Sequence, residues 1–464
     1  MRGPINVVSS ISPRRVSISS GRSERKIVEI ILLLYAHTIT PRLEYITAWI
    51  QEHFIDAPIE LTDSTHRYSS YVGPRLNYSA QRISEQECWI EPNALLFEED
   101  VRSLQVSVSD NGTFPILFCA RGDMGFDVLA ASFYLLSRYE EYLPGNPDIY
   151  GRFDHTRSMA FQHHFLHRPL IDEWMMALMR RLQSIYPDLM GKSARFEWLP
   201  TYDIDESFAY LHKPLWKQLA GCCRDLLMGR MGWVRERIRT HFGAQKDPYD
   251  SFDQIRRLHE PVGIKPVFFF HAGQQVKKYD KALSPEHPAQ QQLIRSVSTW
   301  AEIALHPSWE SGEDPALLHI EKESLERVIG HPVHCSRQHY IRFQLPNTFR
   351  QLIQAGITDD YSMGYGSVNG FRASTARSHY WFDLEKNKST GLRLHPFCFM
   401  EANSFFEAGH RIDAAEKEWR ALEDSIRSVN GRMITIWHNT SLGTQARFAQ
   451  WGERYMEWAS TLKR

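Results

Sequence analysis

The 464-residue sequence predicts an α/β protein in which strands alternate with helices over most of the second half. Short apolar runs of strand length recur after about residue 196, and amphipathic stretches of helical length separate them. Several of these apolar runs end abruptly in a polar residue. Strands that alternate with helices form a mostly parallel sheet, because each crossover helix returns the chain to the same end of the sheet.

The composition is that of a globular protein without a charge bias. Hydrophobic residues make up 42% of the chain, and 54 Lys and Arg balance 55 Asp and Glu, for a formal net charge of −1. This balance excludes a dedicated nucleic-acid-binding protein, which needs a basic surplus. The six cysteines form no Cys-x-x-Cys pair, so we expect free thiols in a reducing compartment. We expect a cytoplasmic protein with neither a membrane span nor a signal peptide.

Residues 27–195 form a predicted N-terminal domain with a mixed α/β pattern. Two runs have the length and composition of strands, Ile27–Ala36 and Pro115–Ala120. Two others have the apolar spacing of amphipathic helices, Phe126–Tyr142 and Ile171–Tyr186. We interpret the charged cluster at residues 137–141 as ion pairs on a helix surface. Residues 1–26 are rich in Ser and Arg and lack periodicity, so we expect them to be disordered.

Residues 196–464 form the second predicted domain, in which four strands end in a residue that can do chemistry. The predicted strands and their following residues are Trp198–Tyr202 with Asp203, Pro266–Phe270 with His271, Glu302–Leu305 with His306, and Met433–Trp437 with His438. Predicted helices lie at Ala289–Trp300, Asp314–Ile329 and Asn347–Ala355. In a barrel, the carboxyl ends of parallel strands meet on one face, so we expect these side chains to gather there.

A basic helical insert at residues 213–246 interrupts this alternation. It holds eight Lys or Arg and two acidic residues, interleaved with apolar side chains such as Trp216, Leu227 and Trp233. Such a segment can make a weak contact with a membrane surface or bind an anionic polymer. A solvated helical flap explains the same pattern, and we prefer that interpretation.

The strand-end residues have the chemistry of a metal site. Asp203 and Asp205 lie where a turn can aim both carboxylates into one pocket, and their mutual repulsion favours a metal ion or a proton there. His306 follows a buried strand and precedes Pro307, and imidazole with carboxylate suits zinc and other first-row metals. His438 can donate a proton to a leaving group.

Residues 336–342 and neighbouring aromatic residues add further candidates. The segment offers another imidazole, His339, and two guanidinium groups, Arg337 and Arg342, which can orient a carboxylate. We expect four further side chains to contact a substrate: Trp309, Tyr340, Arg372 and Trp437.

The order of these motifs resembles that of the polysaccharide deacetylase superfamily, defined by NodB homology and related to carbohydrate esterase family four. The motifs that carry the resemblance are TYDID (201–205), LHPSW (305–309), SRQHYIRF (336–343), DDYSMGY (359–365), GFRAST (370–375), LRLHPF (392–397) and IWHN (436–439). In the first half, FDVLAASFYLLSRYEEYLP (126–144) and DIYGRF (148–153) look like a bacterial branch that has its own N-terminal domain.

The resemblance implies a distorted (β/α) barrel after a mixed α/β N-terminal domain. It also implies one divalent metal ion, commonly zinc, and a carbohydrate substrate that loses an acetyl or similar acyl group, as in N-deacetylation of an amino sugar. A polysaccharide, a glycoside and a lipid-linked sugar are all open as that substrate. By position, Asp203 would be the general base, Asp205 and His306 metal ligands, and His438 the general acid. Arg337 or Arg342 would orient Asp203.

This sequence departs from the family pattern at two motifs. The first motif usually has adjacent carboxylates, but here Ile204 separates them. The second motif usually supplies two His four residues apart, and Glu310 stands at the second position. Either Glu310 or His339 would complete the metal triad, and we favour His339 because the branch has Arg-Gln-His at that point. The branch also has Asp near the position of Glu401.

Two other functions are compatible with these residues. A metal-dependent glycosyltransferase could use the Asp-x-Asp motif with a nucleotide sugar, although no glycine-rich nucleotide loop precedes it. A non-catalytic carbohydrate-binding relative would explain the altered second motif.

Overall fold

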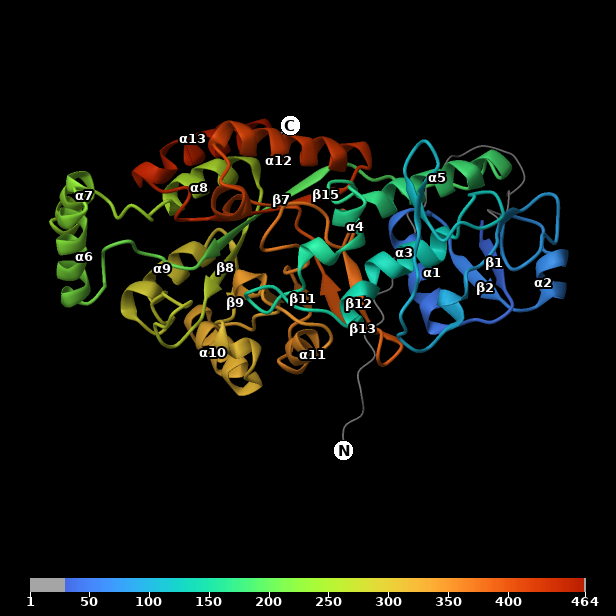
Figure 1. The fold of residues 1–464 in the computed structure, drawn as a ribbon, viewed down its shortest axis with the longest axis horizontal. Coiled ribbons are helices and arrows are strands. Elements are labelled where there is room, and N and C mark those ends of the chain that lie inside the picture. The colour runs from blue at the N-terminus through green and yellow to red at the C-terminus, as the bar shows by residue number, and fades with distance from the viewer. Residues whose placement is uncertain (1–29, 463–464) are drawn as a thin grey trace, which may run out of the picture.

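The computed structural model describes residues 30–462, which form two main sheets, each with its own hydrophobic core (Figure 1). The segment 1–26, expected to be disordered, lies outside the described residues. In the described part of the chain, no helix is long and apolar enough to cross a bilayer. The predicted boundary near residue 195 stays a prediction, with the strands of the two sheets falling on either side of it.

The first sheet has four parallel strands. In spatial order they are β2 (Ile59–Thr62), β1 (Leu32–Ala36), β3 (Arg75–Tyr78) and β4 (Cys88–Ile90). An antiparallel pair, β5 (Val108–Asp110) and β6 (Pro115–Leu117), lies beside them in the chain. The helices of this half are α1 (Pro41–His53), α2 (Thr65–Ser70), α3 (Val128–Leu136), α4 (Met159–Gln162) and α5 (Leu170–Ile185).

The helix predicted over Phe126–Tyr142 is shorter in the structure. Helix α3 ends at Leu136, and a 3-10 turn follows at Tyr139–Tyr142. Arg138 stops the α-helix because its φ of 55° lies in the left-handed region. The helical spacing of apolar residues continues past this break, which explains why the periodicity overestimates the length of the helix.

The second sheet has nine strands and confirms the predicted, mostly parallel α/β arrangement. Its spatial order is β12 (His379–Asp383), β13 (Lys388–Leu394), β11 (Asp359–Asp360), β10 (Cys335–Ser336), β9 (Glu302–His306), β8 (Val267–His271), β7 (Glu197–Ile204), β15 (Arg432–His438) and β14 (Phe399–Met400). Only the β12–β13 pair is antiparallel. The edge strands β12 and β14 do not pair with each other in the described chain, so the sheet is open rather than a closed barrel.

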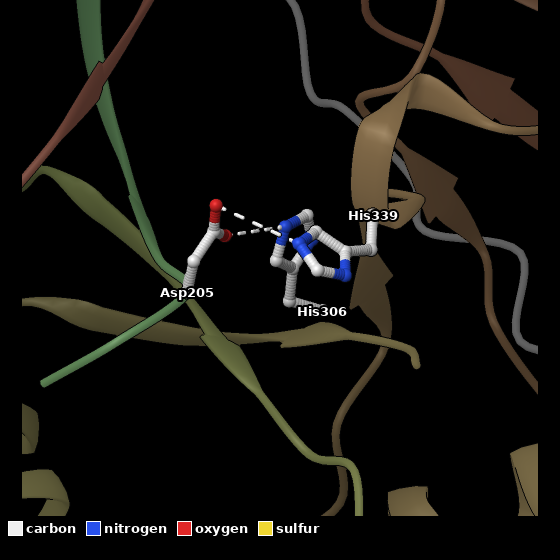
Figure 2. A group of neighbouring side chains, drawn as sticks. All are labelled: Asp205, His306 and His339. Atoms are coloured by element: carbon white, nitrogen blue, oxygen red, sulfur yellow. Dashed lines mark ion pairs between the residues drawn. The ribbon is translucent and has the colours of Figure 1, made fainter. Parts of the chain in front are cut away.

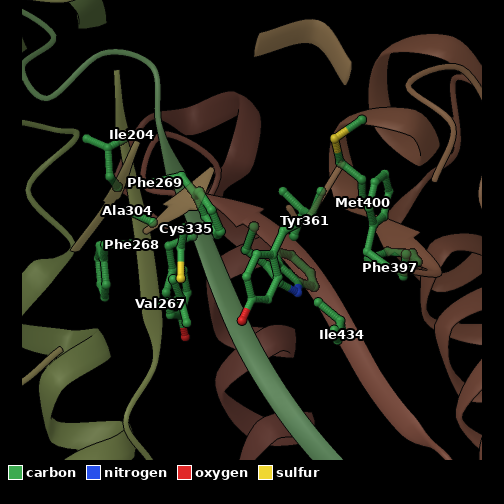
Figure 3. Close-up of a cluster of buried hydrophobic side chains, with 14 of the residues drawn as sticks. Ile204, Val267, Phe268, Phe269, Ala304, Cys335, Tyr361, Phe397, Met400 and Ile434 are labelled. Carbon is green, nitrogen blue, oxygen red and sulfur yellow. The ribbon is translucent and has the colours of Figure 1, made fainter. Parts of the chain in front are cut away.

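Helices and a large apolar cluster cover the second sheet. The helices are α8 (Phe252–His259), α9 (Pro288–Ser298), α10 (Pro315–Ile329), α11 (Asn347–Gln354), α12 (Ile412–Ser428) and α13 (Ala449–Thr461). Side chains from several strands and from the residue after β11 meet in the core shown in Figure 3, among them Phe269, Ile434 and Tyr361, respectively. Phe268 to Phe270 are all fully buried, as expected for a strand of a parallel sheet covered on both faces.

The two halves of the chain contact each other through buried polar groups. The Tyr45 hydroxyl on α1 donates to the Tyr380 carbonyl at 2.7 Å, and Trp49 Nε1 donates to the Ser378 carbonyl at 3.2 Å. Glu141 pairs with Arg138 at 2.7 Å and with Arg372 at 2.6 Å. Our interpretation of residues 137–141 as surface ion pairs is therefore wrong, because Arg138 and Glu141 are buried in this contact.

A helical hairpin made by α6 (Leu215–Leu227) and α7 (Met231–His241) forms the predicted insert. It projects at one end of the molecule, opposite the first sheet (Figure 1). Strand β7 precedes the insert in the chain and β8 follows it, and the two strands pair directly in the nine-stranded sheet.

Candidate metal centre

The carboxyl ends of four adjacent strands bring the predicted residues together. In the β-sheet register, His438 of β15 pairs with Asp203 of β7, and His271 of β8 pairs with His306 of β9. Asp205 follows β7 directly. The parallel direction of the strands places these side chains at one edge of the sheet, as their positions after apolar runs predict.

Asp205, His306 and His339 form a compact cluster. His306 Nε2 lies 3.1 Å from Asp205 Oδ1, and His339 Nε2 lies 3.6 Å from Asp205 Oδ2. One ligand atom of each residue lies within 4.8 Å of the others. Figure 2 shows the Asp205 carboxylate facing both imidazoles.

Hydrogen bonds outside the cluster fix both imidazoles. His306 Nδ1 donates to the Arg337 carbonyl at 2.6 Å, and His339 Nδ1 donates to Asp280 Oδ1 at 3.0 Å. With Nδ1 engaged in this way, Nε2 is the atom of each ring that faces Asp205 and that can bind a metal ion once it carries no proton. Metal-binding histidines in proteins are commonly held in this way by a carboxylate or a backbone carbonyl.

The cluster fits a divalent metal ion. Asp205 Oδ1 is buried and accepts no hydrogen bond in the described part of the chain, although His306 is close. Burial raises the pKa of Asp205, but positive charge on His339 and His438 outweighs this and holds the pKa well below its usual range. One carboxylate with two imidazoles is a donor set that zinc and similar metals prefer.

Asp203 lies beside the cluster and is oriented by an arginine. The buried Arg337 Nη1 donates to Asp203 Oδ1 at 2.6 Å, and Arg337 Nε donates to the Tyr361 carbonyl at 3.0 Å. Asp203 Oδ2 lies 3.9 Å from His306 Nε2. The arginine therefore holds one oxygen of Asp203 and leaves the other beside the candidate ligands.

Of the two arginines proposed to orient Asp203, the structure places only Arg337 there. Arg342 instead donates to the Trp309 carbonyl at 3.1 Å and pairs with Glu313. Glu310, the alternative third ligand, pairs with Lys277 outside the cluster. Of the two candidates for the third ligand, His339 therefore lies in the cluster and Glu310 does not.

His438 faces Asp205 from the other side. His438 Nε2 lies 3.6 Å from Asp205 Oδ2, and His438 Nδ1 donates to Glu401 Oε1 at 2.8 Å. Burial lowers the pKa of His438, but the Glu401 and Asp205 carboxylates outweigh this and raise it to about 10. The imidazole is therefore protonated at neutral pH and can donate a proton.

A cavity of about 530 Å³ opens on the cluster. Its lining includes Asp203, Asp205, His306, His339 and His438, with Tyr150 and Arg152 from the first half of the chain. Tyr340, another lining residue, is the first of two consecutive residues with left-handed backbone, at φ values of 59° and 54°. Such strain in residues other than glycine often accompanies functional sites.

The remaining predicted substrate contacts differ in position. Trp309 lies next to the cavity wall, where it stacks on Tyr279 with ring centroids 4.1 Å apart. Trp437 is fully buried against Tyr455, and Arg372 is buried in its pair with Glu141. Neither Trp437 nor Arg372 is among the residues that line the cavity, so their geometry does not support a substrate contact.

Two acidic residues that hold the histidines were missed as site residues in the sequence. Asp280 lies in the loop after β8, with no recognisable spacing to His339. Glu401 directly follows the two-residue strand β14, so a strand-end signal exists, but it is too short to identify from periodicity. In the sequence, Glu401 stands out only as a departure from the family pattern.

A comparison with protein families matches one model, in the first half of the chain. A family model, described as a family of unknown function (DUF7033), matches residues 32–187. No curated protein matches the sequence significantly.

The structural similarities concern deacetylases and an allantoinase. A protein assigned as a polysaccharide deacetylase from Mycobacterium smegmatis is 15% identical, with 58% of this chain and 85% of that chain covered and a TM-score of 0.38. The allantoinase PuuE is 12% identical, with 58% and 85% covered and a TM-score of 0.36. A protein assigned as a polysaccharide deacetylase from Pseudomonas aeruginosa PAO1 is 11% identical, with 58% and 86% covered and a TM-score of 0.36. Similarities this low establish no family for the chain.

Proposed function

We propose that this protein is a metal-dependent hydrolase that removes an acetyl or similar acyl group from the nitrogen of an amino sugar. One observation carries the proposal: the cluster of Asp205, His306 and His339 opens on a cavity and has a carboxylate, Asp203, and a protonated imidazole, His438, beside it. A metal-dependent amide hydrolase uses these three functions, a metal site, a base and an acid, around one substrate position.

Asp205, His306 and His339 would hold the metal ion. Zinc or a similar ion bound there would polarise an amide carbonyl and make a water molecule more acidic. The Nδ1 atoms of His306 and His339 are hydrogen-bonded to the Arg337 carbonyl and to Asp280, respectively. These bonds keep both Nε2 atoms directed toward the same place before a metal ion binds. Pre-orientation of this kind lowers the conformational cost of binding.

Asp203 is the proposed general base. The Arg337 guanidinium holds Oδ1, while Oδ2 lies close enough to His306 to face a water molecule at the cluster. In the reaction Asp203 takes a proton from water as the water oxygen bonds to the carbonyl carbon.

His438 is the proposed general acid. Glu401 holds its Nδ1 and favours the protonated ring, so Nε2 carries a proton on the cavity side. That proton passes to the amide nitrogen as the carbon–nitrogen bond breaks, which lets the amine leave as a neutral group.

The cavity supports a carbohydrate as the group that carries the amide. Its volume of about 530 Å³ suits a small ligand or part of a longer chain. Tyr150 and Tyr340 line it, with ring centroids 5.5 Å apart, and Arg152 and Asn403 add polar groups. Aromatic faces with a few polar groups are suited to the apolar faces and hydroxyls of a sugar ring.

The geometry favours a hydrolase over the glycosyltransferase alternative. In that alternative both carboxylates of the Asp-x-Asp motif would be available to a metal-bound nucleotide. Here Arg337 occupies one oxygen of Asp203, and histidines surround Asp205. The acid His438 would also have no evident role in sugar transfer.

The test compares metal content and acetate release in the wild type, His306→Ala and Glu310→Gln. After incubation with zinc, we expect the wild type and Glu310→Gln to bind metal and release acetate from N-acetylated amino-sugar oligomers. We expect His306→Ala to bind no metal and to keep less than about 1% of the rate.

Two results would contradict the proposal. Acetate release by His306→Ala at the wild-type rate would remove the metal from the mechanism. A wild type that binds metal but releases no acyl group from any N-acylated amino sugar would leave a non-catalytic binding protein.

A further inference from the structure

The helical hairpin at residues 213–246 has an unusual distribution of polar and apolar side chains. It is attached to the body of the protein at Asp247, whose carboxylate accepts from the Ala209 and Tyr210 backbone N–H groups at 2.7 and 2.9 Å. From there α6 and α7 extend to one end of the molecule (Figure 1). The hairpin can therefore be considered as a separate surface element.

The interface between the two helices is polar. Arg237 of α7 donates to Gln218 Oε1 at 2.9 Å and to Asp225 Oδ2 at 3.0 Å, and all three side chains are buried. The Arg237 guanidinium also lies over the Tyr210 ring, 4.4 Å from its centroid. A helix pair in water normally buries its apolar face, whereas the buried side chains of α6 and α7 are polar except for Val234.

The outer surface of the hairpin is apolar. Leu227 is 89% exposed, Phe242 85% and Leu215 73%. Further exposed apolar side chains of this segment are Trp216, Leu219, Leu226, Met228, Met231 and Ile238. Exposed apolar side chains scattered singly need no explanation, but a group this dense marks an interaction surface. A solvated flap, which we preferred from the sequence, leaves this group unexplained.

Unpaired positive charge accompanies the apolar surface. The two acidic side chains of the insert are already engaged, Asp225 by Arg237 and Glu236 by the Tyr210 hydroxyl at 2.7 Å. Among the described residues, no acidic partner pairs with Arg235 or Arg239, nor with Lys217 or Arg230. The hairpin therefore presents apolar side chains and excess cationic charge together.

We propose that this hairpin docks on a lipid bilayer that contains anionic phospholipids. The apolar side chains enter the boundary between headgroups and acyl chains, and the free Arg and Lys side chains contact lipid phosphates. The combination fits an anionic membrane better than a second copy of the chain. In a two-fold symmetric dimer the same cationic patch would face itself, whereas anionic lipid complements it.

The experiment measures sedimentation of the full-length protein with vesicles of phosphatidylcholine, with and without phosphatidylglycerol, at low and high salt. Two variants separate the contributions. Leu219→Gln/Leu227→Gln/Phe242→Gln removes apolar groups and keeps the charge, whereas Arg235→Gln/Arg239→Gln removes charge and keeps the apolar groups. Val72→Gln is the matched control, because Val72 is 96% exposed but lies in the first half of the chain.

We expect the wild type and the control to bind anionic vesicles, more weakly at high salt, and each hairpin variant to bind at least about tenfold more weakly. The proposal is overturned if the wild type stays in the supernatant under every condition, or if both hairpin variants sediment like the wild type. It is also overturned if the wild type does not bind vesicles but forms a dimer, and the variant with the apolar groups removed is monomeric. Unchanged thermal melting would show that the variants fold.

Discussion

Two groups of histidine and aspartate share His339, and they differ in accessibility. The first, Asp205 with His306 and His339, lines the cavity. In the second, His271 with Asp280 and His339, all three side chains are buried and only His339 lines the cavity. In each group the candidate ligand atoms lie within 4.8 Å of one another, so proximity alone does not distinguish them.

Hydrogen bonding distinguishes the two groups. Asp280 accepts from His271 at 2.8 Å, from His339 at 3.0 Å and from the Trp309 backbone N–H at 3.1 Å. Burial is the main cause that lowers the pKa of His271, to about 4, so its ring is neutral. Asp205 Oδ1, by contrast, accepts no hydrogen bond that meets the same geometry from residues 30–462, although His306 Nε2 lies 3.1 Å away. The same residue types thus form a candidate metal site in the first group. In the second group the Asp280 carboxylate already accepts hydrogen bonds and holds His339 in place.

The largest expected effect separates the two groups directly. Asp205 belongs only to the open group and His271 only to the buried one. We expect Asp205→Asn to weaken zinc binding more than about 100-fold, because it removes a charged ligand. We expect His271→Asn to weaken it by less than about tenfold, because it removes a partner of Asp280 only. Calorimetric titration with zinc measures both, and the reverse order of effects would place the ion in the buried group.

A smaller effect is expected from the residue that connects the groups. Asp280→Asn keeps the shape of the side chain but weakens the hydrogen bond that orients His339. We expect zinc affinity to fall about 10–100-fold, as for other residues that orient a ligand. Glu313→Gln is a control, since Glu313 pairs with Arg342 outside the cavity lining. An Asp280→Asn protein with wild-type affinity would show that Asp280 does not orient the ligand.

The effect that is smallest for a single step, here one pH unit, concerns protonation of His339. Burial lowers the pKa of His339, but the Asp205 and Asp280 carboxylates outweigh this and raise it to about 9. The metal-free protein therefore carries an imidazolium below that pH, and a metal ligand must be neutral. We expect zinc affinity to fall about tenfold for each pH unit below about 9 and to level off above it. Titrations in buffers of different ionisation enthalpy would detect the released proton, and affinity independent of pH would contradict this.

Much of the site could be predicted because its residues follow strands. Asp203, His306 and His438 each stand at the end of an apolar run, and parallel strands bring such ends to one edge. The open form of the sheet could not be predicted in the same way. It depends on whether the two edge strands meet, and one of them, β14, has only two residues.

Contacts between distant segments were the least predictable. The sequence offered Arg337 and Arg342 equally, and only the fold brings Arg337 to Asp203, 134 positions away. Trp437 and Arg372 lie near site motifs in the sequence but point into the core and the contact between the two halves. The left-handed conformation of Arg138 could not be predicted either, because one of the groups that its side chain contacts, the Tyr365 hydroxyl at 3.3 Å, lies far along the chain.

Helix α1 has a consequence for how this chain can be divided. Strand β12 is an edge of the nine-stranded sheet, and Tyr45 of α1 donates a hydrogen bond to the carbonyl of Tyr380 in this strand. Trp49 of α1 donates to the carbonyl of Ser378, the residue just before the strand. An uncovered edge strand exposes unpaired backbone N–H and C=O groups, with which a strand of another chain can pair, and this leads to aggregation. The first half of the chain thus acts as an edge cover for the second. Expressing residues 196–464 alone would expose that edge together with the buried Arg372, and self-association should follow.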